Sequence, residues 1–136
     1  MELVSKLHLI VIKKEVAVDN KNIWIDDTRN PHHFLPKTEA ENVLWLKNIR
    51  QAIQYVSEHS KEIEVLYLDY YMDDNFLFGS EFVYEVLYSG REGYPLLKTI
   101  YLHSSDDDVI QDLIQHEEEF KEMDISLVIA PYRRDY

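Results

Sequence analysis

The stretch Asn22-Ile-Trp-Ile-Asp-Asp27 decides the fold of this chain. Its apolar part has the length of a β-strand and lacks the alternation of polar and apolar residues, which is typical of a strand buried on both faces of a parallel sheet. Two carboxylates follow at once, where such a strand would reach the edge of the sheet. We therefore expect a buried parallel strand whose carboxyl end carries Asp26 and Asp27.

Four further apolar runs of strand length follow along the chain. They occupy residues 43–46, 64–69, 99–104 and 125–130. The run at 64–69 also closes with a carboxylate, Asp69, and Pro131 stops the last run because proline cannot donate to a sheet ladder. The sequence thus predicts five strands, two of which end in aspartates.

Apolar residues at helical spacing lie between these runs and predict three helices. The helices are expected from Ile49 to near His59, over residues 80–87, and from a cap at Ser105 or Asp106 to Phe120. Gly90 and Gly93 would end the second helix. Residues 28–41 are polar, contain two prolines and are expected to form mostly loop. Strands that alternate with helices pair in parallel through right-handed crossovers, so the predicted fold is α/β with a doubly wound sheet.

The length of 136 residues fits one domain with one core. Two short β-prone pieces, at residues 8–12 and 15–18, are joined by Lys13 and Lys14 and predict an added N-terminal hairpin within residues 1–20. We expect a single domain over residues 1–136. Because unpaired strand edges invite pairing, a homodimer formed through such an edge is a further hypothesis.

The composition limits the partners of the chain. It has 26 acidic and 14 basic residues and a net charge of −12, so it would repel phosphate backbones and is not expected to bind nucleic acid non-specifically. The same charge fits either a solvated surface or an acidic face for a basic protein partner. No cysteine is present, which permits a reducing cytoplasm, the expected location. The N-terminal apolar run, residues 7–12, is too short to span a membrane.

Polar side chains with chemical capacity lie where the predicted strands end. Asp26 and Asp27 follow one strand, Asp69 closes another, and His103 and Ser104 close a third. In open parallel sheets ligands bind beyond the carboxyl ends of the strands. Three carboxylates at one edge repel one another, and a hard divalent cation that prefers oxygen ligands offsets this repulsion. The pattern therefore predicts a metal at this edge.

Three segments of the chain resemble the cyclic-phosphate processing receiver family. They are Ile23-Trp-Ile-Asp-Asp-Thr-Arg-Asn-Pro31, Leu68-Asp69 and Leu102-His-Ser104, within a receiver-like (flavodoxin-like) pattern that spans residues 22–131. The resemblance implies a five-stranded receiver fold that handles a cyclic phosphate, on an RNA end or a small molecule, with Mg²⁺ or Mn²⁺. It also implies the following roles: Asp26, Asp27 and Asp69 around the metal, Arg29 near the phosphate and His103 as acid or base. Asp69, His103 and Arg29 are then the expected catalytic residues, and Ser104 is expected to bind the cofactor.

Two departures from the family pattern affect this interpretation. Tyr70 and Tyr71 stand where the family has His-Asp, which removes a titrating group and a carboxylate. Ala130 stands where ordinary receivers have a lysine before the proline, so phosphorylation of Asp69 in a conventional phosphorelay is not expected.

Two functions from different classes are consistent with these residues. The first is a metal-dependent phosphoesterase, a hydrolase, that acts on a cyclic phosphate. The second is a non-catalytic acidic module that binds a protein partner or sequesters a ligand, for example a phage factor that inhibits a host defence protein. The tyrosine pair, Ala130 and the negative charge favour the second hypothesis.

Overall fold

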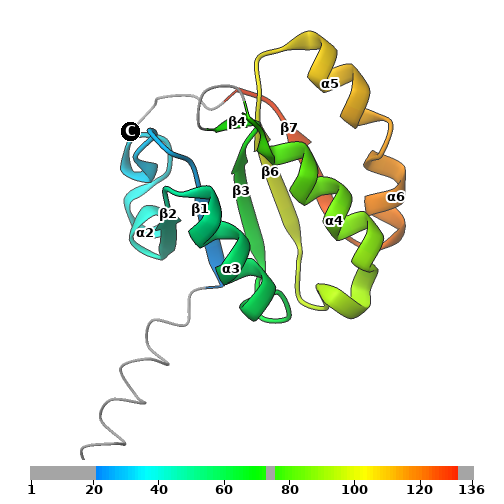
Figure 1. Cartoon of the computed structure of the whole chain (residues 1–136), viewed down its shortest axis with the longest axis horizontal. Helices are drawn as coiled ribbons and strands as arrows, with labels where there is room; N and C mark the ends of the chain where they lie inside the picture. The colour runs from blue at the N-terminus through cyan, green and yellow to red at the C-terminus, as the bar shows by residue number, and fades with distance from the viewer. Residues whose placement is uncertain (1–20, 73–75, 132–136) are drawn as a thin grey trace, which may run out of the picture.

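Five parallel strands form the centre of the computed structural model, which describes residues 21–72 and 76–131. The strands are β1 (Asn22–Ile25), β2 (Val43–Leu46), β3 (Val65–Asp69), β6 (Thr99–His103) and β7 (Ser126–Ile129). Their spatial order is β2-β1-β3-β6-β7, and every pair is parallel (Figure 1). The fold is therefore the predicted α/β receiver-like sheet. The hairpin predicted within residues 1–20 lies outside the described residues.

Successive side chains of each strand point to opposite faces of the sheet. On one face Ile23, Ile25, Leu66, Leu68, Ile100 and Leu102 are all buried in the main hydrophobic core. On the other face one row of the register aligns Trp45, Trp24, Tyr67 and Tyr101. The rings of Tyr67 and Tyr101 stack with centroids 4.9 Å apart. Both faces are thus apolar, as expected for a parallel sheet.

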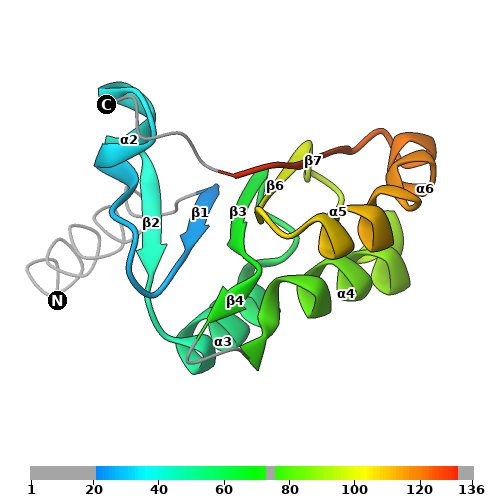
Figure 2. The same ribbon diagram turned by 90° about the horizontal axis from the view of Figure 1, so that it is seen from above.

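Helices cover the two faces unequally. The helices are η1 (Pro31–His33), α2 (Lys37–Glu41), α3 (Ile49–His59), α4 (Phe78–Gly93), α5 (Asp107–Ile114) and α6 (Glu117–Glu122). Viewed from the end at which the strands finish, α3 and α4 lie on one side of the sheet and α2 lies on the other (Figure 2). Asn48 caps α3 by accepting hydrogen bonds from the backbone N–H groups of Arg50 and Gln51.

The predicted strands are confirmed to within one or two residues, but two expectations are wrong. Residues 28–41 hold η1 and α2 rather than mostly loop, because Pro31 and Pro36 stand at helix starts, where proline is tolerated. The single helix expected to reach Phe120 is two helices, because the His116 N–H bonds back to the Leu113 carbonyl and turns the chain before Glu117. No glycine or proline marks this turn; the sequence shows only a gap in the apolar period, with five polar residues at 115–119.

The connection after β3 contains elements that the sequence did not predict. A short antiparallel pair, β4 (Tyr71–Met72) and β5 (Phe76–Leu77), leads directly into α4. Near its end, α4 is interrupted at Gly90, whose φ is 63°. The next residue, Arg91, donates to the carbonyls of Met123 and Leu97 at 2.7 Å each. This guanidinium therefore ties the end of α4 to the chain before β6 and β7.

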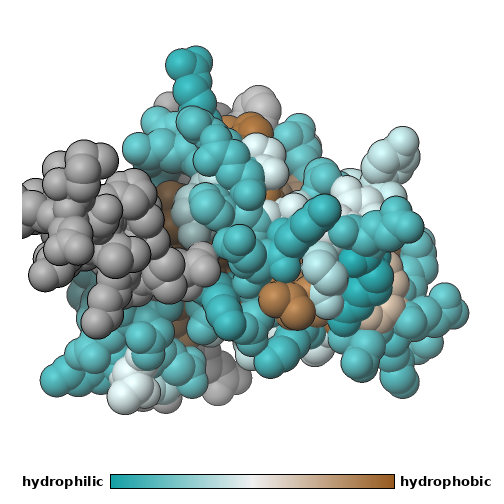
Figure 3. Space-filling model, turned by 90° about the horizontal axis from the view of Figure 1, so that it is seen from below, coloured by the Kyte–Doolittle hydropathy of each residue, from teal (hydrophilic) through white to brown (hydrophobic). Residues whose placement is uncertain are grey.

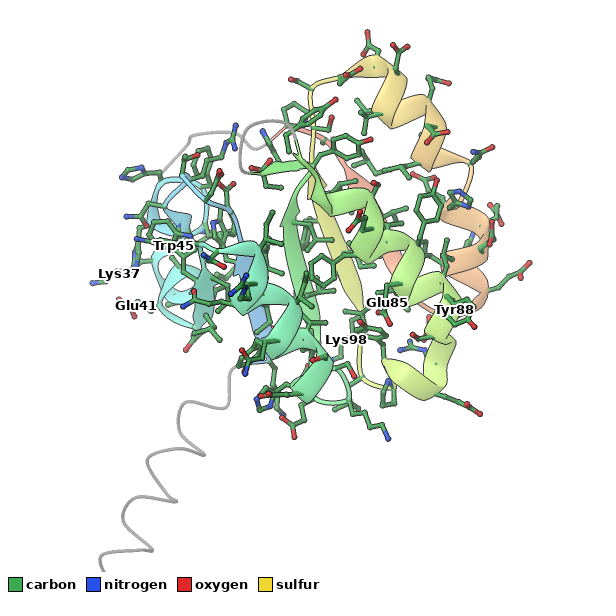
Figure 4. The ribbon with its side chains drawn as sticks, in the orientation of Figure 1. Lys37, Glu41, Trp45, Glu85, Tyr88 and Lys98 are labelled. Atoms are coloured by element: carbon green, nitrogen blue, oxygen red, sulfur yellow. The ribbon has the colours of Figure 1, made fainter. Side chains whose placement is uncertain are left out.

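Side chains at the start of the strands and along the helices are mainly charged or polar. Before β6, Lys98 Nζ lies 2.9 Å from Glu64 Oε1. On α4, Tyr88 is 93% exposed and extends into solvent (Figure 4). Seen from the side at which the strands begin, the surface is mostly hydrophilic, and hydrophobic side chains appear in small separate patches (Figure 3). Among the described helices, none has both the length and the apolar character needed to cross a bilayer.

Candidate functional site

Three carboxylates from two neighbouring strands meet at the carboxyl edge of the sheet. Asp26 and Asp27 follow β1, Asp69 ends β3, and these strands pair in register with Ile25 opposite Leu68. One oxygen of each carboxylate lies within 4.8 Å of the others. Asp26 is fully buried, and Asp69 is 5% exposed. Within the described residues, this is the one group of acid or histidine side chains with metal-ligand spacing.

A tight turn after β1 orients Asp26. Its Oδ1 accepts hydrogen bonds from the backbone N–H groups of Thr28 at 3.0 Å and Arg29 at 2.9 Å. Two indoles hold this turn: Trp24 donates to the Arg29 carbonyl and Trp45 donates to the Asp26 carbonyl, both at 2.8 Å. Oδ1 is thus used by the turn, and Oδ2 is the oxygen that accepts from the Arg29 guanidinium.

The Arg29 guanidinium bridges the two buried carboxylates. Its Nη1 lies 3.4 Å from Asp26 Oδ2 and 3.4 Å from Asp69 Oδ2. The side chain is 34% exposed, so one part of it contacts the buried acids while another faces the pocket. The geometry shows that this edge of the sheet attracts a cation, and in this structure Arg29 supplies the positive charge.

Burial changes the protonation of two site residues. It raises the pKa of Asp69 to about 7; the neighbouring Asp26 adds to the rise and Arg29 opposes it. Burial also lowers the pKa of His103 to about 4, and the positive Arg29 adds to this effect. Near pH 7 the pocket thus holds a carboxylate that is only partly ionised and a neutral imidazole.

His103 and Ser104 lie at the same edge, at the end of β6. The register places His103 opposite Asp69 on the neighbouring strand. Ser104 is 4% exposed, and its Oγ accepts a hydrogen bond from the Asp106 N–H at 3.1 Å. Because the oxygen acts as acceptor in the turn before α5, the hydroxyl hydrogen remains the group with which Ser104 could contact a ligand.

These side chains line a pocket of about 240 Å³. Its walls are formed by Asp27, Thr28, Arg29, Asp69, Tyr71, His103, Ser104, Ser105 and Asp106. Asp26 lies beneath it. The structure thus brings together all six residues predicted for the site: Asp26, Asp27, Arg29, Asp69, His103 and Ser104. Their chemical roles remain predictions.

Sequence reasoning missed Tyr71 and Asp106 as pocket residues. Asp106 was expected as a cap of α5, and it does accept the Asp108 N–H at 2.9 Å, but its other carboxylate oxygen lies 3.3 Å from the Tyr71 hydroxyl. Tyr70 is 8% exposed and belongs to the core, whereas Tyr71 is 39% exposed. Two identical adjacent residues give no signal as to which one is buried and which one lines the pocket.

The donor set fits a hard divalent cation. All three candidate ligand atoms are carboxylate oxygens, the type that Mg²⁺ and Mn²⁺ prefer. Two of the carboxylates already share a positive partner at equal distances, which shows that their oxygens converge on one point. A buried acidic cluster of this kind could hold a metal ion.

Comparison with known proteins agrees with this geometry. Residues 21–121 match the family of the cyclic-phosphate processing receiver domain. The chain belongs to this family. The matched region of the receiver domain runs from the residue before β1 into α6 and includes all six predicted site residues. No curated protein and no solved structure matches the chain.

Proposed function

We propose that this receiver domain is a metal-dependent phosphoesterase that opens a cyclic phosphate, either the 2′,3′-cyclic phosphate of an RNA end or a small cyclic nucleotide. The observation that carries the proposal is the approach of Asp26, Asp27 and Asp69 oxygens to within 4.8 Å of one another, in a pocket that also holds Arg29 and His103. Family membership supplies the phosphate chemistry.

Asp26, Asp27 and Asp69 are the residues that would hold Mg²⁺ or Mn²⁺. When bound, such an ion offsets the charge of the carboxylates and polarises the phosphoryl oxygens of the ligand. The fit of the oxygen donors supports this assignment.

Arg29 would bind the phosphate. Its guanidinium contacts Asp26 and Asp69 through one nitrogen, Nη1, at 3.4 Å, so the planar fork has further N–H groups for an anion in the pocket. The side chain also lines the pocket wall. We infer that Arg29 balances the acids when the pocket is empty and pairs with the phosphate when a ligand is present.

His103 and Ser104 would serve the reacting group. Ring opening adds one water: its oxygen bonds to phosphorus, one ring P–O bond breaks, and the leaving oxygen takes up a proton. A neutral imidazole accepts the proton of the attacking water and can return it to the leaving oxygen. The Ser104 hydroxyl hydrogen can donate to a phosphoryl oxygen, because its Oγ accepts from the Asp106 N–H.

The test is ring opening followed by phosphorus NMR. Purified protein is incubated with 2′,3′-cyclic AMP, 3′,5′-cyclic AMP and an RNA oligomer that ends in a 2′,3′-cyclic phosphate, each with Mg²⁺ or Mn²⁺. We expect a monoester product from at least one substrate, and a loss of roughly 100-fold or more in rate for Asp26→Asn and His103→Gln. Asp26→Asn keeps an oxygen for the turn, and Glu118→Gln on α6 is the matched control. No product from any substrate, or full activity of Asp26→Asn, would overturn the proposal.

A non-catalytic binding module is the second candidate. The exposed Tyr71 in the pocket, where the family pattern has an acidic residue, and the net charge of −12 favour it. Stoichiometric binding of a cyclic nucleotide without turnover in either metal would support ligand sequestration. Binding of a basic protein partner that persists after Asp26→Asn and Asp69→Asn would support the protein-binding form.

A further inference from the structure

Among the tyrosines of the described residues, Tyr71 is the one that lines the candidate pocket. It lies two residues after Asp69, and its backbone N–H is close enough to that carboxylate to lower the pKa of Asp69 against the effect of burial. The ring is 39% exposed. An aromatic face is therefore available at the edge of the same pocket that holds the acids and Arg29.

The Tyr71 ring is held at two points. The ring of the buried Tyr70 contacts it edge to face, with centroids 4.6 Å apart and an interplanar angle of 81°. The Tyr71 hydroxyl donates to Asp106 Oδ2 at 3.3 Å, and Asp106 is itself fixed as the N-cap of α5. Anchoring at both ends lowers the entropy that the ring would lose when a ligand stacks on it.

The size of the pocket places a bulky ligand partly outside it. At about 240 Å³ the pocket is below the usual range for sites that enclose a whole drug-sized ligand, roughly 300–1,000 Å³. A cyclic phosphate and part of a sugar would fill it, with the phosphate near Arg29. Anything attached to the sugar would then extend to the mouth of the pocket, where the exposed face of Tyr71 lies.

Charge at the mouth limits what else the ligand can carry. Asp106, Asp107 and Asp108 form the start of α5 beside the pocket, and the whole chain has a net charge of −12. If the ligand carried a second or third phosphate that extended out of the pocket on this side, these carboxylates would repel it. A neutral base has no such penalty and gains stacking energy from any aromatic face.

We infer that Tyr71 is a stacking residue for a nucleobase, and that the ligand of this site is a cyclic mononucleotide rather than a base-free cyclic phosphate or the end of a longer RNA strand. This inference rests on the proposed function of the pocket and adds its ligand class. Stacking does not read hydrogen-bond patterns, so purine and pyrimidine mononucleotides should both bind.

The experiment measures binding to the full chain by titration calorimetry in Mg²⁺. The probes are 2′,3′-cyclic AMP, 2′,3′-cyclic UMP, the base-free methyl riboside 2′,3′-cyclic phosphate, and a dinucleotide that ends in a 2′,3′-cyclic phosphate. The variants are Tyr71→Leu, which removes the ring, Tyr71→Phe, which keeps it, and Tyr88→Leu, a matched control on α4 that is 93% exposed (Figure 4).

We expect wild-type protein to bind cyclic AMP about 10-fold more tightly than the base-free probe. Tyr71→Leu should lose about this factor for both mononucleotides and leave the base-free probe unchanged, because it has no base to stack. The affinity of Tyr71→Phe for the mononucleotides should stay within about threefold of the wild-type affinity. The affinity of Tyr88→Leu should equal that of wild type. In turnover, Tyr71→Leu should raise KM with little change in kcat, since stacking is similar in the ground and transition states.

Equal affinity of wild type for cyclic AMP and the base-free probe would overturn the inference, as would an equal loss on both probes in Tyr71→Leu. Tighter binding of the dinucleotide than of the mononucleotide would overturn the assignment to mononucleotides. In each of these cases cyclic phosphates still bind, so the proposed function stands. If no cyclic phosphate binds at all, both the inference and the proposed function fail.

Discussion

Asp69 holds its proton much more tightly in the fold than in the unfolded chain. Its pKa is about 7 in the fold because of burial and the neighbouring Asp26, against an ordinary value of 3.8. A raised folded pKa means that the folded state holds the proton more tightly. The contribution of Asp69 to the free energy of unfolding is therefore fully present below about pH 4 and is lost as the pH rises through 7.

His103 acts in the opposite sense, because its pKa is about 4 in the fold against an ordinary value of 6.5. Its contribution to the free energy of unfolding is present above about pH 6.5 and is lost as the pH falls through 4.

The prediction concerns metal-free Asp69→Asn. Between about pH 6.5 and pH 8 the His103 contribution is constant, so the remaining loss of stability in wild type comes from Asp69. Asparagine cannot ionise, so the stability advantage of Asp69→Asn over wild type should grow by on the order of 2 kcal/mol between about pH 5 and about pH 8. Urea denaturation with a chelator measures this. Glu118→Gln, an exposed carboxylate on α6, should show no such pH dependence; an advantage of Asp69→Asn that does not grow with pH would contradict the prediction.

At the residue scale, the sequence predicted the meeting of Asp26, Asp27 and Asp69 because strand ends in a parallel sheet share one edge. The family resemblance implied a place near a phosphate for Arg29, and in the fold Arg29 pairs with Asp26 and, across the strands, with Asp69. The pairing with Asp69 depends on the conformation of the turn after β1. Two hydrogen bonds from indole N–H groups hold this conformation. That information is tertiary, so no local pattern could supply it.

At the scale of elements, the contact between α4 and β3 positions Asp69. The Gly79 N–H donates to the Tyr70 carbonyl at 3.2 Å, so the first turn of the helix rests on the end of the strand. A Cβ at this position would lie 2.6 Å from Leu102 Cδ1, 2.8 Å from Tyr70 Cα and 2.9 Å from the Asp69 carbonyl oxygen. Two of these three atoms belong to the backbone of Asp69 and Tyr70, which cannot move without moving the Asp69 carboxylate.

Gly79→Ala should therefore reduce both stability and metal binding. Overpacking against backbone costs about 1–3 kcal/mol, and displacement of Asp69 should weaken Mg²⁺ or Mn²⁺ binding severalfold. Gly90→Ala is the control: its φ of 63° and ψ of −160° lie in a region that only glycine adopts readily, so the variant should lose on the order of 1–3 kcal/mol of stability. No atom lies within 4 Å of the new Cβ, so metal affinity should stay unchanged. Calorimetric titration with the metal and thermal denaturation test both variants. Unchanged metal affinity in Gly79→Ala would show that the helix does not position the carboxylate.

Elements were predictable from sequence where a single pattern governs them. Each strand is an apolar run that ends at a charge, a polar residue or a proline, so the bounds were found to within two residues. The turn between α5 and α6 is made by a backbone hydrogen bond of His116, within the polar residues 115–119 that contain no glycine or proline. The short helices η1 and α2 begin at prolines. Propensity gives no warning of such features, because tertiary packing decides them.

For the whole molecule, an excess of acidic residues and a carboxylate cluster at one edge of the sheet act together. The net charge of −12 destabilises the compact state through self-repulsion, which any salt screens. The cluster of Asp26, Asp27 and Asp69 adds a local repulsion among buried oxygens, which a bound divalent ion relieves far better than screening does. Thermal denaturation in MgCl₂ or MnCl₂ and in NaCl of matched ionic strength separates the two effects.

We expect the divalent salts to raise Tm above the NaCl value. At about ten times the dissociation constant, one site stabilises the fold by roughly 1.4 kcal/mol, which is a shift of several degrees for a chain of this size. Asp26→Asn and Asp69→Asn should lose this additional rise in Tm.

The control is a triple variant with Glu117, Glu118 and Glu119 each changed to Gln, which removes three charges from α6, far from the cluster along the chain. This variant should keep the additional rise in Tm. If it loses the rise as fully as Asp26→Asn does, the effect of the divalent salts comes from the overall charge and the edge of the sheet holds no metal site.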